Sequence, residues 1–438
     1  MAIINKIKNL VQHQGFRRYA ANTSWMLAEQ MLRIVAGLLV GIWVARYLGP
    51  EQFGLFSYVL AFTAIFSGIA KLGLDGILVR ELINHPQGRD IYLGTAFWLK
   101  VMGAFVVMAI MVVIVPFMSN DSTTNLYIYI IAVGLFFQSF EVVEFYFQSQ
   151  VMAKIISICK FTQLALSSVV KIFLVLTQAD LFWFVCVTTF DMISLAASYY
   201  VAYRIRRSIS FFKKFDFDIA KQLLENSWPL IFSSFVITIY MRIDQVMIAH
   251  FMSGHDVGIY SAAVKISEVF YIIPMLLTAS IYPAIINAKI QNEELYYLRI
   301  SRLYAFLFWC AAVIAIFVTI FKDDIILLLY GSEYVGSAII LSVHVWSGLF
   351  VFVGVAFSRY LLVENLNGIA LKRTLIGAIA NVVLNYILIP SYGLIGAALA
   401  TLIAQIIANY LYDFFDPRLH RHLVLKTRSV LFPWLFFK

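Results

Sequence analysis

Charged side chains occur inside long apolar segments of this sequence, and they are the residues whose types could do chemistry. A charge at the centre of a membrane-spanning helix costs about 2.5–3.5 kcal/mol, so such residues normally face a cavity or a partner. We treat the cations as candidate substrate-binding groups and the acids as candidate ion-coupling or ion-pairing groups. The cations are Arg33, Lys100, Lys171, Arg242 and Lys265. The acids are Glu29, Glu141, Glu144, Asp191, Asp244 and Glu268.

Helical spacing places some of these charges on a common face. Glu29 and Arg33 are four residues apart, and Lys265 and Glu268 are three apart. Residues at these spacings are neighbours on a helix surface. For each of these pairs, two interpretations are equally good. The pair is either a structural ion pair that joins helices or part of a functional site. A further polar stripe consists of Gln138, Glu141, Glu144 and Gln148.

The other candidates differ in their position within the apolar segments. Lys100 lies near the end of its segment, where we expect the ammonium to extend to the membrane surface. Lys171 lies deeper, on a stripe with Gln163 and Ser167, which favours a functional role. For His344 we expect a hydrogen-bonded packing role rather than a proton relay.

The composition requires that these segments lie in lipid. Of the 438 residues, 62% are hydrophobic and 13% are charged, whereas soluble domains contain about 25% charged residues. The net charge of +9 comes from Lys and Arg residues scattered between apolar runs, so no nucleic-acid partner is expected. The three cysteines lie in apolar runs without metal-ligand spacing, which predicts neither a disulfide framework nor a metal site.

The apolar runs predict an all-α integral membrane protein with twelve transmembrane helices, because about 20 apolar residues cross a bilayer core. The predicted spans are about 22–46, 54–72, 92–117, 126–148, 156–177, 181–203, 227–250, 258–283, 302–321, 337–358, 371–390 and 394–413. Spans nine, ten and twelve have no charge in their interior, and Lys372 and Arg373 lie at one end of the eleventh. We therefore expect the chemistry to be confined to the first eight helices.

The distribution of Lys and Arg predicts that both termini lie in the cytoplasm. With this orientation only Arg46 and Lys322 fall in outside loops, and the other Lys and Arg residues that lie outside the spans are cytoplasmic. Such an excess of cytoplasmic cations sets the topology of membrane proteins. The first twenty residues alternate apolar and basic positions at helical spacing, which predicts an amphipathic helix on the cytoplasmic surface rather than a signal peptide.

An internal repeat divides the chain into two halves. At an offset of 204 residues, the sequence 53–57 aligns with 257–261, Asn22 with Asn226, and Ala45 with Ala249. Halves of six spans each have the same orientation, which is typical of transporters built from parallel repeats. The predicted organisation is 1–20 amphipathic helix, 21–203 first six-helix bundle, 204–226 basic linker, 227–413 second six-helix bundle and 414–438 basic cytoplasmic tail.

Several segments resemble the bacterial O-antigen and capsule flippases, the Wzx-type polysaccharide transporters of the MATE-like superfamily. These segments are 46–56 (RYLGPEQFGLF), 72–75 (LGLD), 79–81 (VRE), 227–230 (SWPL), 241–248 (MRIDQVMI), 257–260 (VGIY), 381–385 (NVVLN) and 389–401 (IPSYGLIGAALAT). The resemblance implies the MATE-like fold, two pseudo-symmetric six-helix bundles that open alternately to either side. Related lipid II flippases usually carry two further spans, whereas the apolar tail 430–437 is too short to cross a bilayer.

The resemblance also implies a substrate and a route. We expect the chain to move undecaprenyl-pyrophosphate-linked oligosaccharides to the outer leaflet of the bacterial inner membrane through a cationic central cavity. Arg242 is the preferred phosphate ligand, because it lies in a family-like segment and its guanidinium can contact a phosphate at two points. Membrane lipids and other polysaccharide assembly proteins are the further expected partners.

The sequence predicts no cofactor and leaves the energy source open. It contains no G-x-x-x-x-G-K-[ST] loop, so hydrolysis of ATP by a P-loop is not expected. An inside-negative membrane potential favours outward movement of an anion by about 2.3 kcal/mol per charge per 100 mV. Coupling to a proton or sodium gradient is the alternative, with Glu29, Glu141 or Asp191 as carriers.

Two other functions remain open at this point. A cation-coupled multidrug exporter of the same fold would be expected to have an acidic cavity for cationic drugs. A membrane glycosyltransferase or polymerase would need a large external loop with catalytic groups. The longest predicted outside loop, 322–336, offers only Asp323, Asp324 and Glu333, and we expect a transporter without catalytic residues.

Overall fold

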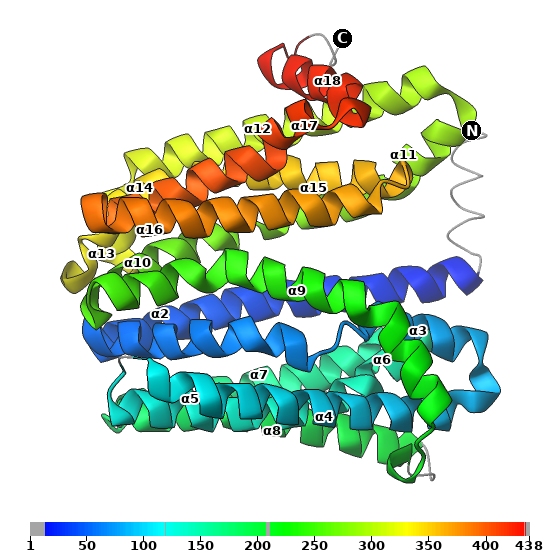
Figure 1. The fold of residues 1–438 in the computed structure, drawn as a ribbon, viewed down its shortest axis with the longest axis horizontal. Helices are drawn as coiled ribbons and strands as arrows, with labels where there is room; N and C mark the ends of the chain where they lie inside the picture. Colours follow the sequence, from blue (N-terminus) through cyan, green and yellow to red (C-terminus); the bar gives the residue numbers. More distant parts are fainter. Residues whose placement is uncertain (1–13, 119, 207–210, 433, 435–438) are drawn as a thin grey trace. The chain divides into compact units, whose positions relative to one another are not determined.

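The computed structural model describes residues 14–118, 120–206, 211–432 and 434, and these residues form helices joined by short turns, with no β-strand among them (Figure 1). A helix satisfies its own backbone hydrogen bonds, which is the requirement for crossing lipid. The predicted N-terminal amphipathic helix lies mostly outside the described residues, and the first described helix already begins at Gln14.

The α-helices are α2 (Gln14–Ala70), α3 (Asp75–Asn84), α4 (Arg89–Ile114), α5 (Ser122–Gly134), α6 (Glu141–Ser149), α7 (Ala153–Leu176), α8 (Leu181–Arg206), α9 (Phe217–Phe251), α10 (Gly254–Val269), α11 (Ile272–Gln291), α12 (Glu293–Ile320), α13 (Lys322–Leu329), α14 (Ser337–His344), α15 (Ser347–Val363), α16 (Asn367–Ile406), α17 (Tyr412–Phe415) and α18 (His420–Leu431). Short 3₁₀ turns cover Pro86–Gly88, Val115–Phe117, Leu135–Phe140, Phe211–Lys213, Ser332–Tyr334 and Pro417–Leu419, and a π-helical turn covers Ile407–Leu411.

Ten helical stretches of the described chain are long and apolar enough to cross a membrane. The twelve predicted spans all fall on these stretches, because the first stretch, Asn22–Asn84, and the last, Gly368–Phe415, each contain two of them. The two long helices are interrupted at Gly49 (φ 68°) and Gly393 (φ 58°). Glycine reaches positive φ without a Cβ penalty, so the chain changes direction there between one span and the next.

The chain divides into two compact units, each containing parts of α2 and α9. The first unit is Met1–Tyr47 with Phe62–Phe235, and the second is Leu48–Ala61 with Val236–Lys438. This division differs from the sequence-based boundaries in two ways. The start of the second predicted span belongs to the second unit, and α9 begins inside the predicted linker and continues the first unit as far as Phe235.

The first unit is built around one apolar core. Its fully buried members include Leu78 of α3, Leu93 of α4, Phe147 of α6 and Leu223 of α9. In this unit α7 and α5 both pack along α8, and α3 packs against α6. The predicted span 126–148 is interrupted by the 3₁₀ segment Leu135–Phe140, and a new helix, α6, begins at Glu141. The polar stripe therefore begins in the 3₁₀ segment and continues along α6.

The second unit is built around three of its own helices, α12, α15 and α16. Helix α15 packs against both α12 and α16, and these three run alongside one another in Figure 1. The predicted basic tail is largely helical, because it contains α18. This helix packs on α12 with one buried face. Leu423 and Lys426 of α18 are buried, whereas Arg421 and Arg428 are exposed.

Candidate functional site

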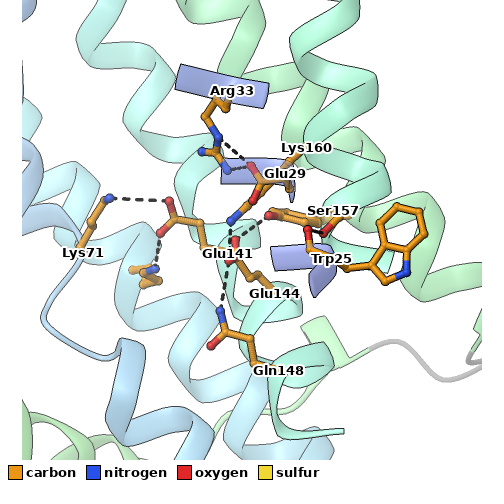
Figure 2. A network of polar contacts seen from close by, with 11 residues as sticks. Trp25, Glu29, Arg33, Lys71, Glu141, Glu144, Gln148, Ser157 and Lys160 are labelled. Carbon is orange, nitrogen blue, oxygen red and sulfur yellow. Dashed lines mark hydrogen bonds and ion pairs between the residues drawn. The ribbon is translucent and has the colours of Figure 1, made fainter. Parts of the chain in front are cut away.

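A buried ion pair between α4 and α6 lies in the core of the first unit. Lys100 Nζ donates to Glu141 Oε2 at 2.8 Å and lies 3.9 Å from the carboxylate of Asp75. Lys71 approaches the other oxygen of Glu141 at 3.8 Å (Figure 2). The Lys100 side chain is only 2% exposed, so the predicted extension to the membrane surface is wrong. Acids on two neighbouring helices offset the cost of burying the ammonium.

Glu144, one turn beyond Glu141, joins three helices. Its Oε1 accepts from Lys160 of α7 at 2.6 Å and from Gln148 at 3.1 Å, and its Oε2 accepts from the hydroxyl of Tyr199 of α8 at 2.5 Å (Figure 2). Both oxygens are therefore occupied by donors of the same unit. Glu144 stabilises the bundle and offers no free oxygen to a transported ion.

Helix α2 brings the predicted pair of Glu29 and Arg33 next to α7. The Arg33 guanidinium donates to Glu29 from Nε at 2.7 Å and also from Nη2. Ser157 of α7 fixes α2 nearby by donating to the carbonyl of Trp25 at 3.1 Å (Figure 2). Glu29 is almost fully buried while the Arg33 side chain is 47% exposed. Arg33 is therefore able to reach an anion without leaving its carboxylate.

Asp191, the acid of a second ion pair in the first unit, lines a pocket of about 220 Å³. Lys171 Nζ lies 2.9 Å from Asp191 Oδ2 and 2.8 Å from the hydroxyl of Ser167, as its predicted stripe suggested. Asp191 and Glu141 both face the pocket, as does Gln138. Asp191 Oδ1 and Gln138 Oε1 are buried and have no hydrogen-bond partner. These two oxygens are acceptors without a donor in the described structure.

The second unit contains a buried carboxylate, Asp244, surrounded by neutral donors. Asn385 Nδ2 donates to Asp244 Oδ1 at 2.6 Å, and the Tyr260 hydroxyl donates to Oδ2 at 2.7 Å. Thr401 also donates to Oδ2. Asp244 is 6% exposed and takes part in none of the ion pairs of the described chain. A carboxylate so placed has hydrogen bonds but no counter-charge.

Unpaired amide oxygens accompany Asp244. The Oδ1 atoms of Asn381 and Asn385 are buried without a partner, and the Nδ2 of Asn381 lies 3.5 Å from the Thr401 hydroxyl. Asp244 and Thr401 line a cavity of about 20 Å³, which is room for one water-sized species. Glu268, the ion-pair partner of Arg242, lines the same cavity. Carboxylate and hydroxyl oxygens suit a proton or one monovalent cation. A cluster of three or more His, Cys, Asp or Glu residues, as multivalent metals require, is absent from the described residues.

The amide and hydroxyl groups of this centre were not identified from the sequence. Asn381 and Asn385 are one helical turn apart on α16, and Thr401 lies on the same long helix after Gly393. The expectation that the chemistry is confined to the first eight helices considered charged residues alone, and it left out the polar groups of α16 that hydrogen-bond Asp244. Uncharged polar side chains inside predicted spans, which often bond across helices, are the signal that could have identified them.

The remaining candidate cations of the second unit have partners of different kinds. Arg242 forms an ion pair with Glu268 at 3.5 Å, and its side chain is 34% exposed. Lys265 lies over the ring of Phe53, 4.5 Å from its centroid. Glu268, predicted to pair with Lys265, also has Arg242 of α9 as an ion-pair partner. The long, partly exposed contact leaves guanidinium donors of Arg242 available to a phosphate.

His344 and Ser267 form a buried hydrogen bond of 2.7 Å between α14 and α10. His344 is 3% exposed and its main-chain carbonyl accepts from Ser347 at 2.6 Å. These contacts agree with the packing role expected for this histidine. The His344 ring also packs edge-on against the ring of Tyr260, with centroids 6.2 Å apart.

A third polar cluster attaches α18 to the end of α16. Lys426 donates to Asp413 Oδ2 at 2.7 Å and to the carbonyl of Asn409 at 2.8 Å, inside the π-helical turn. His422 pairs with Asp413 through Nδ1 at 2.8 Å and with the Tyr304 hydroxyl through Nε2 at 2.6 Å. Burial lowers the pKa of His422 to about 4 and that of Lys426 to about 8. Complete burial makes this cluster an anchor rather than a binding site.

Two family models match the chain. The model described as "Polysaccharide biosynthesis protein" matches residues 19–289, and the model MatE matches residues 229–387. The first match covers more than half of the chain and includes both the Glu141 and the Asp244 regions.

Curated proteins with similar sequences come from polysaccharide and glycan pathways. The chain is 22% identical to the capsular polysaccharide biosynthesis protein CapF of Staphylococcus aureus over 408 residues, covering 91% of this chain and 99% of the relative. It is 26% identical over 208 residues to the probable low-salt glycan biosynthesis flippase Agl15 of Haloferax volcanii, covering 46% of this chain and 44% of the relative.

Solved structures with a similar fold are transporters of the MOP superfamily. An inward-facing multidrug resistance MATE family transporter aligns with a TM-score of 0.72 at 17% identity, covering 93% of this chain and 99% of the other. The lipid II flippase MurJ, in an inward closed conformation, aligns with a TM-score of 0.67 at 16% identity, covering 94% and 91%. At such identities the likeness establishes the MATE-like fold alone.

Proposed function

Because the chain belongs to the polysaccharide biosynthesis protein family, we propose that it is a flippase that carries lipid-linked polysaccharide units across the inner membrane. The observation that carries this proposal is the match to that family over residues 19–289, together with similarity to a capsular polysaccharide protein over nearly its whole length. The chain is a multi-pass membrane transporter with a MATE-like fold and not an enzyme.

The carrier lipid that we propose is undecaprenyl pyrophosphate. Its phosphates would be bound by an arginine that keeps donors exposed while its carboxylate partner holds it in place. Arg33 in the first unit and Arg242 in the second each have this arrangement, and each is considered by itself. Arg242 is the preferred ligand because its 3.5 Å contact with Glu268 is the looser of the two, and a guanidinium binds phosphate through two parallel hydrogen bonds.

Lys100 and Lys171 have a different proposed role from the arginines. Each is bonded to an acid of its own unit at 2.9 Å or less. Removing one charge of such a buried pair leaves the other uncompensated. We assign these lysines to holding the helices of the first bundle in register, so that the pocket walls formed by Glu141 and Asp191 stay in place.

The coupling ion that we propose binds at Asp244. Asp244, Glu268 and Thr401 line a cavity of about 20 Å³. Asn385 and Asn381, which hydrogen-bond Asp244 and Thr401, keep buried amide oxygens without partners. A proton or an alkali cation would supply the charge that Asp244 lacks. Binding there would change the attraction between α9 and α16, which both contribute to the site. A gradient of that ion could then drive the conformational cycle.

Arg242 provides the test of the flippase assignment. With Arg242→Ala as the only copy, we expect correct insertion and at least a tenfold loss of surface polysaccharide, with accumulation of lipid-linked units inside. Arg242→Lys should recover part of the export, because it restores the charge but not the two-point contact. Normal surface polysaccharide with Arg242→Ala would contradict the phosphate role. Loss of drug resistance with intact polysaccharide in cells lacking the protein would instead favour a multidrug exporter.

A further inference from the structure

Helix α18 buries a mostly polar face and exposes a partly apolar one. His422, Lys426 and Ser429 recur at spacings of four and three residues and are fully buried, together with Leu423. The opposite face carries exposed arginines and aliphatic side chains at helical spacing, namely Arg421, Val424, Arg428 and Leu431. A surface helix of a water-soluble protein turns its apolar stripe inward. The reverse arrangement in α18 indicates that its outer face does not lie in water alone.

The end of α18 extends this exposed face with aromatic residues. Phe432 and Trp434 are 44% and 58% exposed and contact each other edge-on, with ring centroids 5.5 Å apart. Large apolar side chains that are exposed together mark a contact with a membrane or a partner. Aromatic side chains are concentrated where a membrane meets water, so the composition of this end favours the membrane surface.

A hydrogen bond to α12 fixes the level of the aromatic end. The indole of Trp309 donates to the carbonyl of Val430 at 3.1 Å. Trp309 lies inside the predicted span 302–321, about 10 Å along the helix from its start. Surface helices lie about 5–10 Å deep, at the boundary between headgroups and acyl chains. Val430 therefore lies at the level of this boundary.

The arginines of this region place positive charge at the same level. Arg418 pairs with Asp416 at 2.7 Å, and Arg421 pairs with Glu293 at 3.0 Å. Arg428 is exposed and forms no ion pair with the residues that the structure describes. It therefore supplies one positive charge without a counter-charge. The phosphate of an acidic phospholipid is complementary to it, because a guanidinium can bind phosphate through two hydrogen bonds.

We propose that α18 is a membrane-surface helix whose outer face contacts lipid and whose Arg428 binds the phosphate of an acidic phospholipid. The buried contacts of His422 and Lys426 with Asp413 fix the rotation of the helix, so that this face points away from the second unit. The helix lies against α12 and α17 (Figure 1). The charge distribution predicts that this end of α12 is cytoplasmic, and acidic lipids are abundant in the cytoplasmic leaflet. Lipid contact of α18 does not depend on what the chain transports.

Spin labels test the position of α18. The three native cysteines are replaced by alanine, and a label is attached to Val424→Cys or Leu431→Cys, which lie opposite the buried face. In nanodiscs that contain phosphatidylglycerol, oxygen reports access from lipid and a nickel chelate reports access from water. We expect an oxygen-to-nickel ratio at least threefold above that of Glu294→Cys, an exposed position at the start of α12. Val313→Cys, 65% exposed within the α12 span, is the control for lipid.

A titration tests the arginine. Short-chain phosphatidylglycerol is added to the protein in neutral detergent, and the mobility of the label on Val424→Cys reports binding. We expect saturable binding that weakens about fivefold with Arg428→Gln, which is the contribution of one cation near an anionic membrane surface. Arg204→Gln removes the same charge at an exposed position at the end of α8 in the first unit, and it should leave the binding unchanged. Short-chain phosphatidylcholine should not give saturable binding.

Three results would overturn the proposal. Nickel access at Val424→Cys equal to that at Glu294→Cys would place α18 in water. Low access of both reagents would show that a second copy of the chain covers the helix instead of lipid. Equal affinities of the Arg428→Gln and Arg204→Gln variants for phosphatidylglycerol, or equal binding of the two lipids, would remove the acidic phospholipid from Arg428.

Discussion

The carboxylate of Asp244 accepts a 2.6 Å hydrogen bond from the side-chain amide of Asn385, a residue 141 positions later in the chain. This contact links α9 to α16 and places the Oδ1 of Asn385 beside a carboxylate without a counter-charge. It belongs to the ion site that we propose for coupling.

Asp244→Asn is expected to uncouple transport from its ion. The neutral amide keeps the size of the side chain but removes the charge that would attract a cation. In proteoliposomes with lipid-linked glycan, we expect at least a tenfold loss of the stimulation produced by a sodium or proton gradient. Ser391→Ala, at an exposed position on the same α16, should behave as the parent. Equal gradient stimulation in Asp244→Asn and the parent would remove Asp244 from the coupling mechanism.

Lys100→Met is expected to destabilise the first unit more than the double variant Lys100→Met with Glu141→Leu. Breaking a buried ion pair costs about 3–5 kcal/mol because one charge remains uncompensated, whereas replacing both partners by apolar groups is often neutral. Thermal unfolding of the purified protein in detergent measures the difference. A double variant as unstable as the single one would show that Lys71 and Asp75 govern the site instead.

Acidification is expected to loosen the attachment of α18. Burial lowers the pKa of His422 to about 4, below the ordinary value of 6.5. His422 binds a proton more readily when α18 is detached and the imidazole is exposed than when α18 is docked. Docking of α18 therefore weakens as the pH falls from about 6.5 towards 4. Below pH 4 the loss reaches about 3 kcal/mol, since each pKa unit corresponds to about 1.4 kcal/mol. Hydrogen exchange of residues 420–431 should show this dependence.

His422→Gln supplies the control for that experiment, because glutamine has no proton to gain in this range. Its exchange should vary less between pH 6.5 and 4 than that of the parent. An identical dependence in both proteins would assign the effect to another group of the cluster, such as Asp413.

Gly393→Ala is expected to destabilise the second unit by about 1 kcal/mol or more. Gly393 has φ 58° at the interruption of α16, and an alanine at positive φ is strained. The measurement is the melting temperature of the purified protein. Gly368→Ala, at the start of α16 with nothing within 4 Å of its Cβ, should leave the melting temperature unchanged or slightly raised. Equal melting temperatures for both variants would mean that α16 can form without the interruption.

Part of the candidate site was predictable from local spacing. Glu29 with Arg33 is an ion pair, and Lys171 does meet Ser167, because residues four apart share a helix face whatever the rest of the fold does. The partners of Lys100 and of Glu268 were not predictable in this way. Both come from other helices, and the distance along the chain contains no information about which helices become neighbours.

By itself, the sequence determined membrane residence, the helical fold and the existence of two related halves. Lipid allows few ways of satisfying a backbone, so hydropathy alone leads to helices, and glycine with proline marks the interruptions at Gly49 and Gly393. Tertiary structure decided which polar groups converge. Asp244 acquired its hydrogen-bond donors only when Asn385 and Thr401 packed against it, and the repeated glycines Gly54 and Gly258 became a contact only when α2 met α10. Burial and partnership depend on packing between distant segments, and packing is a property of the whole fold.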